Sequence, residues 1–358
     1  MAAALPSAYH GPSAYHGPPQ LTAARVFTSW TLDLPVLIAV LLAAGLYLAG
    51  ARRARRSGRS WPAGRPAAFC AGGLGVLVIA TMSVIGVYQG TLFYVRSMQT
   101  ILLLLVAPLF LVLGRPLSLA VATLPRLGPR LEAAVSSRAA RILTFPAITT
   151  TVLVLVPFVL YFSPWYAASL QGSAVREVTY LALLAPGYVF FWTLLRVDPV
   201  PKAYPYLVAL WVTGAEVVGD AVLGLAVMAD QNLIAGGYYH ALVRSWGPSL
   251  STDQVLGGGV LWILGDIVGL PFLAAQLIQM IREDEAEAVV IDAELDAADA
   301  ADAADAAGAG TPPAPLAAEP AETRAGPATD AGEPTAGSQP WWESDPRFAD
   351  RFRSAGDA

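Results

Sequence analysis

Seven apolar stretches, each close to the length that crosses a lipid bilayer, constrain the fold of this chain more than any other feature. They lie near residues 33–50, 67–87, 97–114, 146–163, 177–195, 206–229 and 255–281. A helix needs about 20 apolar residues to cross a hydrocarbon layer of about 30 Å. The chain is also 55% hydrophobic and only 14% charged, which is unusual for a soluble protein. We therefore expect an all-α integral membrane protein with seven transmembrane helices.

The arginines predict how these helices are oriented. Six of them lie in ARRARRSGRSWPAGR after the first stretch, and the loops after the third and fifth stretches are also basic. These three loops lie on one side of the membrane, which the positive-inside rule identifies as the cytoplasm. The N-terminus is then expected outside and the C-terminus in the cytoplasm. Between residues 115 and 142, apolar residues at helical spacing alternate with arginines, which predicts an amphipathic helix on the inner leaflet.

Composition divides the chain into three parts: a leader (1–24), a membrane domain (25–285) and a tail (286–358). The leader duplicates PSAYHG, lacks the features of a signal peptide and is expected to be disordered, although His10 and His16 offer an alternative as a weak metal site. From Glu283 onward 18 acidic residues face 4 arginines (net −14), whereas the preceding part has a net charge of +9. We expect a disordered acidic tail, with the terminal WWESDPRF either solvated or a docking motif.

Polar residues inside the apolar stretches form a second pattern. Glu216 and Asp220 lie four residues apart and therefore on one helical face. A charged group in the membrane is costly unless it is paired or faces a cavity. Arginines at the outer ends of two other stretches are available as partners. We expect an outward-facing polar cluster that comprises Arg96, Gln99, Arg176, Glu177, Tyr180, Glu216, Asp220 and Asp266.

Two interpretations of this cluster stay open. Helical rise places Asp220 about 9 Å deeper than Arg96, a distance that an arginine side chain and one water can cover. Alternatively, both arginines extend to the outer headgroups and the acids are protonated contacts between helices. If Arg96 and Asp220 pair, Arg96→Gln and Asp220→Asn should each destabilise the protein, and the double change should cost less than their sum.

Several functional classes have no support in the sequence. There is no phosphate loop, dinucleotide fingerprint or zinc signature, and no nucleic-acid partner is expected. A retinal protein needs a lysine in the last span, but the single lysine, Lys202, lies in a loop. His240 suits the membrane interface better than a ligand role, and Cys70 suits a small core residue.

Five segments, in order, carry a resemblance to a known family. They are TSWTLD at 28–33, LLLVAPLFLVLGRPLSLA at 103–120, GYVFFWTLLRVDPVP at 187–201, GLAVM at 224–228 and DQVLGGGVLWILGD at 253–266. Together they resemble the bacterial CtaG-type cytochrome c oxidase assembly factors over about residues 25 to 285. The resemblance implies a seven-helix protein of the bacterial plasma membrane that helps to mature the copper-containing oxidase.

The chain differs from that family at its histidines. Where the family's third span has two histidines four apart around a glutamine, this chain has Arg96 and Thr100 around Gln99. Positions that match further family histidines carry Arg176, Tyr180, Ala182 and Asp220, and Asp266 matches an acidic position. Imidazole is a good copper ligand but arginine is not. Copper is therefore a cofactor implied by the resemblance alone, and an ion-pair network in place of a metal is the hypothesis that the substitutions suggest.

These observations favour a non-enzymatic accessory factor that binds oxidase subunits or other assembly factors within the membrane. A transporter or proton-linked carrier that uses Glu216, Asp220 and Asp266 is a second hypothesis. The third is a structural paralogue that serves another membrane complex. No catalytic residue is predicted.

Overall fold

The computed structural model describes residues 15, 17–202 and 204–308, and the chain divides into two compact units, Met1–Ala293 and Glu294–Ala358. The described residues form helices and no strand. The elements are α1 (Ala23–Thr28), α2 (Leu34–Arg56), α3 (Gly64–Pro66), the π-helix η1 (Ala67–Leu74), α4 (Gly75–Met82), α5 (Val84–Tyr88), α6 (Phe93–Ile101), the π-helix η2 (Leu102–Val106), α7 (Ala107–Leu113), α8 (Pro116–Thr123), α9 (Gly128–Val135), α10 (Arg138–Leu143), α11 (Pro146–Tyr161), α12 (Pro164–Gln171), α13 (Ser173–Leu195), α14 (Tyr206–Ala229), α15 (Gly236–Ala241) and α16 (Leu250–Gly308).

The predicted all-α membrane architecture is confirmed in its main feature. Six helical segments are long and apolar enough to cross a membrane, and the count reaches seven if the pair α11 and α12 is one span. Helix α11 has 16 residues, and α12 leaves it at 71°. The bend lies at Ser163. Its extended backbone separates the two helices, its side chain caps α12 by accepting from the Trp165 amide, and Pro164 begins α12.

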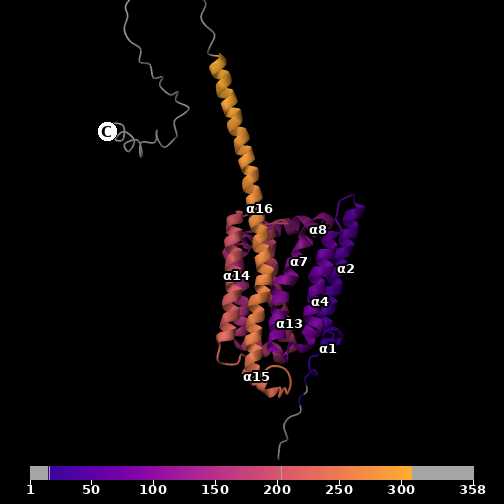
Figure 1. Ribbon diagram of the computed structural model, residues 1–358. Helices are drawn as coiled ribbons and strands as arrows, with labels where there is room; N and C mark the ends of the chain where they lie inside the picture. Colours follow the sequence, from indigo (N-terminus) through magenta and orange to yellow (C-terminus); the bar gives the residue numbers. More distant parts are fainter. Residues whose placement is uncertain (1–14, 16, 203, 309–358) are drawn as a thin grey trace, which may run out of the picture. The chain divides into compact units, whose positions relative to one another are not determined.

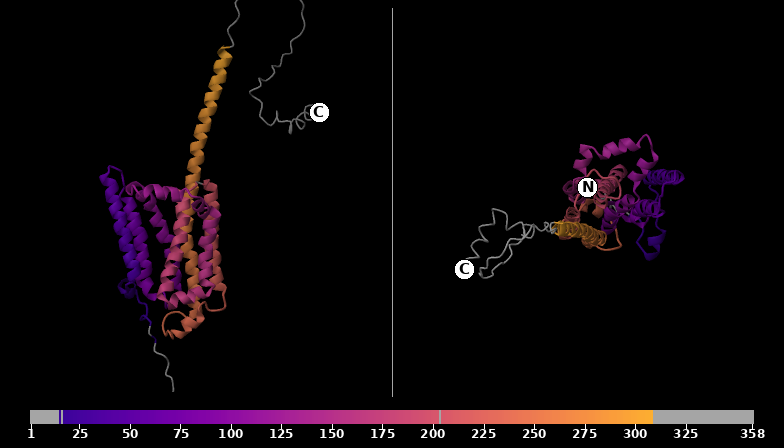
Figure 2. Two further views of the ribbon diagram at one scale, coloured as in Figure 1. Left: turned by 180° about the vertical axis from the view of Figure 1, so that it is seen from behind. Right: turned by 90° about the horizontal axis from the view of Figure 1, so that it is seen from above.

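The spanning helices of the first unit run side by side, with α8 across one end of the bundle and α15 at the other (Figure 1). Helix α2 lies at an edge of the bundle, as the view from above shows (Figure 2). Only 22% of its most apolar window is buried, against 56% for the span that contains α6 and α7. Helix α2 therefore exposes most of its apolar surface, as lipid-facing helices do.

Hydrogen bonds join the three basic loops at the α8 end of the bundle. The Arg59 guanidinium, in the loop after α2, donates to the Ala122 carbonyl of α8 at 2.7 Å. The Asp198 carboxylate, in the loop after α13, accepts from the Leu117 and Ser118 amides at the start of α8 at 3.1 and 2.9 Å. The loops predicted to share one side thus share one end of the bundle. That this end faces the cytoplasm stays a prediction.

The segment from 115 to 142 differs from the single amphipathic helix that its periodicity predicts. It forms three short helices, α8, α9 and α10. Pro125 and the Gly128–Pro129 pair follow α8, and the Ser136–Ser137 pair separates α9 from α10. These residues favour turns and helix caps over helix interiors, so apolar spacing alone was not sufficient to predict one helix. Its position on the inner leaflet stays a prediction.

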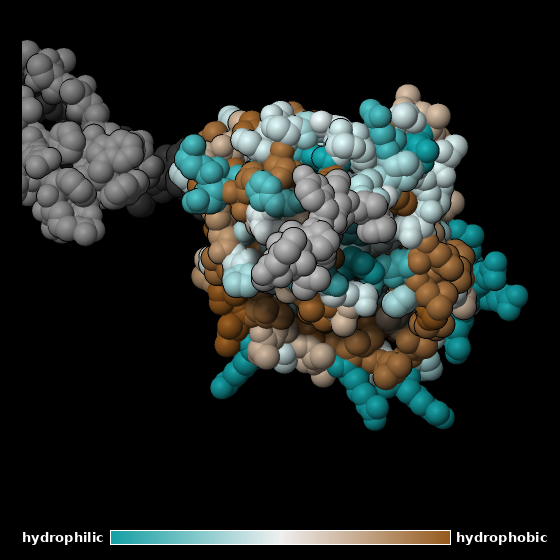
Figure 3. All heavy atoms as spheres, turned by 90° about the horizontal axis from the view of Figure 1, so that it is seen from below, coloured by the Kyte–Doolittle hydropathy of each residue, from teal (hydrophilic) through white to brown (hydrophobic). Residues whose placement is uncertain are grey.

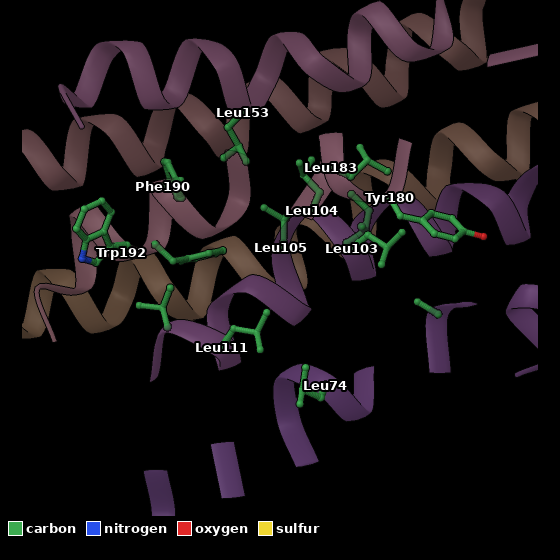
Figure 4. Packing of buried hydrophobic residues seen from close by; sticks show 14 of the residues in the cluster. Leu74, Leu103, Leu104, Leu105, Leu111, Leu153, Tyr180, Leu183, Phe190 and Trp192 are labelled. Atoms are coloured by element: carbon green, nitrogen blue, oxygen red, sulfur yellow. The ribbon is translucent and has the colours of Figure 1, made fainter. Parts of the chain in front are cut away.

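The core is centred on η2 and α13. Figure 4 shows Leu103, Leu104 and Leu105 of η2 facing Leu183 and Phe190 of α13, with the hydroxyl of Tyr180 turned away from the leucines. The two helices approach closely because α13 has a glycine at the contact: a Cβ atom at Gly187 would clash with the Leu104 carbonyl oxygen. This close approach fixes α13 beside the third span, which carries the candidate site.

The polar and apolar surfaces of the first unit are segregated. Seen from the end that carries α15, hydrophobic residues gather on the right side and the lower half of the view, and hydrophilic and intermediate residues lie across its upper part (Figure 3). Large apolar side chains on the sides are exposed, among them Leu46 and Trp211, each 75% exposed. An apolar belt with a polar end is typical of a helical membrane protein.

The predicted ends of the chain are described only in part. Residues 17–24 of the predicted leader are described, and Pro19 accepts a hydrogen bond from the Tyr88 hydroxyl at 2.8 Å. Residues 286–308 of the predicted disordered tail continue α16 as helix, because alanine, the strongest helix former, dominates this stretch. His10, His16 and the terminal WWESDPRF lie outside the described residues.

Candidate functional site

Arg96 is the centre of a buried polar network. Its side chain is 1% exposed and lies in the first turns of α6. One terminal nitrogen donates to Gln89 Oε1 at 2.6 Å and to Gln99 Oε1 at 2.8 Å, and the other donates to Ser169 Oγ at 3.0 Å. The guanidinium is always charged, yet each of these partners is neutral. Among the described residues, this buried cation is thus held by hydrogen bonds and has no carboxylate counterion.

Two glutamines and a tyrosine complete the network. Gln99 donates from Nε2 to the Ala80 carbonyl at 2.7 Å, which fixes its oxygen toward Arg96. The Gln89 amide nitrogen donates to the Tyr180 hydroxyl at 2.8 Å. The glutamines act as adaptors, because each has both a donor and an acceptor. The arrangement connects α6 to α4, α12 and α13.

A cavity of about 450 Å³ adjoins this network. Gln89 lies in its wall, together with Arg176 and Glu177 of α13 and with Asp33, which caps α2. Because Gln89 also contacts Arg96, the cavity and the network share one residue. Two carboxylates and one guanidinium make the cavity wall polar.

The three predicted carboxylates form a separate group, where α14 faces α16. Glu216 and Asp220 are 2% and 3% exposed. A Cβ atom at Gly265 would clash with the Asp220 carboxylate, and one at Gly269 would lie 3.1 Å from Glu216 Oε2. The two carboxylates therefore lie against the backbone of α16. One oxygen each of Glu216, Asp220 and Asp266 is buried without a hydrogen-bond partner.

The structure brings the eight predicted residues together in three sets. Arg96, Gln99 and Tyr180 belong to the buried network, Arg176 and Glu177 line the adjacent cavity, and Glu216, Asp220 and Asp266 lie between α14 and α16. The predicted pair of Arg96 and Asp220 forms no salt bridge. Helix α6 contacts α16 through Phe93 and Ser97 at Gly257, two turns from Gly265, where Asp220 lies.

Sequence reasoning missed several residues of the site. Gln89 and Ser169 lie outside the predicted spans, because Gln89 caps the end of α5 and Ser169 lies in α12, beyond the bend.

A buried ion pair that the sequence analysis did not predict lies at the start of α16. It joins Arg244 to Asp253 Oδ2 at 3.2 Å, and Asp253 Oδ1 also accepts from the Tyr94 amide at 3.1 Å. An acidic residue is favoured at the positive, N-terminal end of a helix. Here Asp253, at the start of α16, accepts a hydrogen bond from the first turn of α6.

A tyrosine pair lies close to this ion pair, at the α15 end. The hydroxyls of Tyr166 and Tyr239 are 3.0 Å apart. Burial raises the pKa of the Tyr239 phenol above its ordinary value, so this group stays neutral and keeps its donor. His240, the next residue, is exposed, in line with an interfacial side chain.

The described residues do not fit copper, the metal that the resemblance implies. Arg96 and Thr100 stand where the resemblance implies a histidine pair, and a guanidinium has no lone pair to offer a metal. No group of three or more His, Cys, Asp or Glu residues with suitable geometry occurs within residues 15, 17–202 and 204–308. The site is therefore a hydrogen-bonded polar centre rather than a ligand set.

Fold and site together define a multi-pass helical membrane protein with a buried, charged polar centre. Residues 45–283 match the family described as cytochrome c oxidase caa3 assembly factor, and the chain belongs to this family. The matched residues include almost all of the first unit's spanning helices and every residue of the candidate site except Asp33.

Curated relatives come from mycobacteria. The uncharacterized proteins Mb0105 of Mycobacterium bovis and MT0111 of Mycobacterium tuberculosis are each 31% identical to the chain over 285 residues, and ML1998 of Mycobacterium leprae is 29% identical over 282 residues. The alignments cover 76 to 77% of this chain but only 42 to 43% of the relatives. The chain thus corresponds to less than half the length of the relatives it matches. No solved structure shows a significant match.

Proposed function

We propose that this chain is a non-enzymatic accessory factor for cytochrome c oxidase assembly in the bacterial plasma membrane. It acts by holding oxidase subunits or other assembly factors within the bilayer. The observation that carries this proposal is the family match over residues 45–283, which includes almost all of the bundle rather than one motif. The polar cavity beside Arg96 offers the partner a fixed set of donors and acceptors.

Deletion of the gene tests the assembly role. We expect membranes of the deletion strain to lose oxidase activity and the oxidase haem spectrum, and the gene to restore both. Wild-type oxidase levels in the deletion strain would overturn the role.

We further propose that the bundle supports maturation of the copper centre through protein contacts and not through its own copper site. Its support is the donor set, in which Arg96 and Thr100 replace a histidine pair. Metal analysis of the purified protein should give copper well below one ion per chain. One copper per chain that is lost on Asp220→Asn or Glu216→Gln would contradict the proposal.

The buried carboxylates favour a second candidate, a proton-linked carrier. Glu216, Asp220 and Asp266 each keep a buried oxygen without a hydrogen-bond partner among the described residues, and carboxylates inside the membrane mark the proton relays of pumps and transporters. Proton flux into liposomes that contain the purified protein, abolished by Asp220→Asn, would support the carrier. Equal flux with and without the protein would exclude it.

A third candidate is a paralogue that serves another membrane complex, since the mycobacterial relatives carry no assigned role. Purification of the tagged protein from mildly solubilised membranes separates the two assembly roles. Oxidase subunits in the eluate support the first, and subunits of another complex support the third.

A further inference from the structure

An apolar groove lies between α2 and α8 at the arginine-rich end of the bundle. Its volume is about 450 Å³, and its walls include Leu46 and Gly50 of α2, Leu119 of α8 and Leu124, which caps the C-terminus of α8. The floor is firm: the rings of Tyr47 and Phe69 stack at 4.1 Å, and the Tyr47 hydroxyl donates to the Gly114 carbonyl at 2.5 Å. The groove is therefore a built feature between packed helices.

Arginines stand at the mouth of this groove. Arg53 lines it and lies on the helical face of Leu46 and Gly50, at positions i, i+4 and i+7. Arg52 and Arg56, one and three residues from Arg53 at the same end of α2, are exposed, and within the described residues none of these three side chains makes a hydrogen bond or an ion pair. By contrast, Arg55 donates a hydrogen bond to the Trp61 carbonyl, and Arg59 donates one to the Ala122 carbonyl. The last turn of α2 thus leaves three cationic groups without a protein partner.

The groove has the chemistry of a lipid site. No acidic residue lines it, so nothing in its wall neutralises the arginines. Its volume is that of a small-molecule site and is too small for a partner helix, which is about 10 Å across. Apolar walls match an acyl chain, and unpaired guanidinium groups at the mouth match a phosphate headgroup.

We propose that the groove between α2 and α8 binds an anionic phospholipid, with its acyl chain against Leu46, Gly50 and Leu119 and its phosphate beside Arg52, Arg53 and Arg56. The lipid would fill the space between the edge helix α2 and α8. This site is distinct from the polar cavity at the α15 end and is independent of the oxidase role.

Native mass spectrometry of the full chain, with equal amounts of phosphatidylglycerol and phosphatidylcholine of matched acyl chains, tests the proposal. The wild type should retain phosphatidylglycerol in preference to phosphatidylcholine. Combined Arg52→Gln, Arg53→Gln and Arg56→Gln should lower phosphatidylglycerol binding about a hundredfold, the combined effect of three arginines near one anionic headgroup. The matched control combines Arg130→Gln, Arg138→Gln and Arg141→Gln, exposed arginines of the same end that lie outside the groove.

The control variant should bind phosphatidylglycerol as the wild type does. A second variant, Ala49→Trp, places an indole on an exposed residue of the groove wall and should reduce binding without a change of charge. This variant keeps the test decisive if the triple variant does not fold. Unchanged phosphatidylglycerol binding in the triple variant or in Ala49→Trp, or equal loss in the control, would overturn the proposal.

Discussion

Arg96 shows how far residue type predicts a site inside a membrane. The sequence identified Arg96, Gln99 and Tyr180 as polar groups that need partners, and the structure joins them. The partners that matter most, Gln89 and Ser169, lie where helices end or bend. A search for charged residues at helical spacing cannot find them, because the path of the chain at Gln89 and Ser163 sets their positions. Helical rise alone left open a pair of Arg96 with Asp220, whereas the structure places the Asp220 carboxylate against Gly265 of α16.

Gln89→Leu should destabilise the protein by about 1.5 to 3 kcal/mol, the usual effect of a lost hydrogen bond to a charged group. Gln89 accepts from Arg96 at 2.6 Å and donates to Tyr180 at 2.8 Å, so the change removes both contacts. Thermal unfolding in detergent measures the effect. The control is Gln231→Leu at an exposed position, where the change should stay within about 0.5 kcal/mol. Equal effects of the two changes would show that the network contributes nothing.

Because Arg96 and Asp220 do not contact each other, substitutions at the two residues should have additive effects on stability. Arg96→Gln and Asp220→Asn alter groups with no common hydrogen-bond partner among the described residues. Their effects on the free energy of unfolding should therefore add to within about 0.5 kcal/mol. A double-mutant cycle measures this sum. A coupling energy above about 1 kcal/mol would restore the ion pair that the sequence suggested.

At the scale of elements, apolar length predicted the spanning helices and missed their irregularities. Each of the seven predicted stretches coincides with a helical segment, because about 20 apolar residues have few alternatives in a bilayer. The 71° bend at Ser163 and the division of residues 115–142 depend on proline, glycine and serine at single positions. The π-helices η1 and η2 have no marker in apolar spacing, since both sequences are almost uniformly apolar.

The contact of α13 with η2 gives a prediction at this scale. Gly187→Ala should destabilise the protein by about 1 to 3 kcal/mol, because the new methyl group meets the Leu104 backbone and the helices must separate. Gly214→Ala in α14 is the matched control: its Cβ atom has nothing within 4 Å, so the higher helix propensity of alanine should leave stability equal or greater. Chemical unfolding in detergent compares the two. A stabilised Gly187→Ala protein would contradict the close packing.

At the scale of the whole molecule, the bundle has two polar regions with different chemistry. The α15 end holds Arg96 in a neutral network beside a polar cavity, and the α8 end gathers basic loops that hydrogen bonds hold together. The family match includes both ends.

We propose that the assembly role depends on the Arg96 network and not on bound copper. The haem spectrum and the oxidase activity of a deletion strain test this, when the strain is complemented with the wild type, with Gln89→Leu or with Gln231→Leu, each at equal membrane levels. We predict restoration by the wild type and by Gln231→Leu, and a reduced oxidase signal with Gln89→Leu. Full restoration by Gln89→Leu would contradict a role for the network, and an unaffected oxidase in the deletion strain would contradict the assembly role itself.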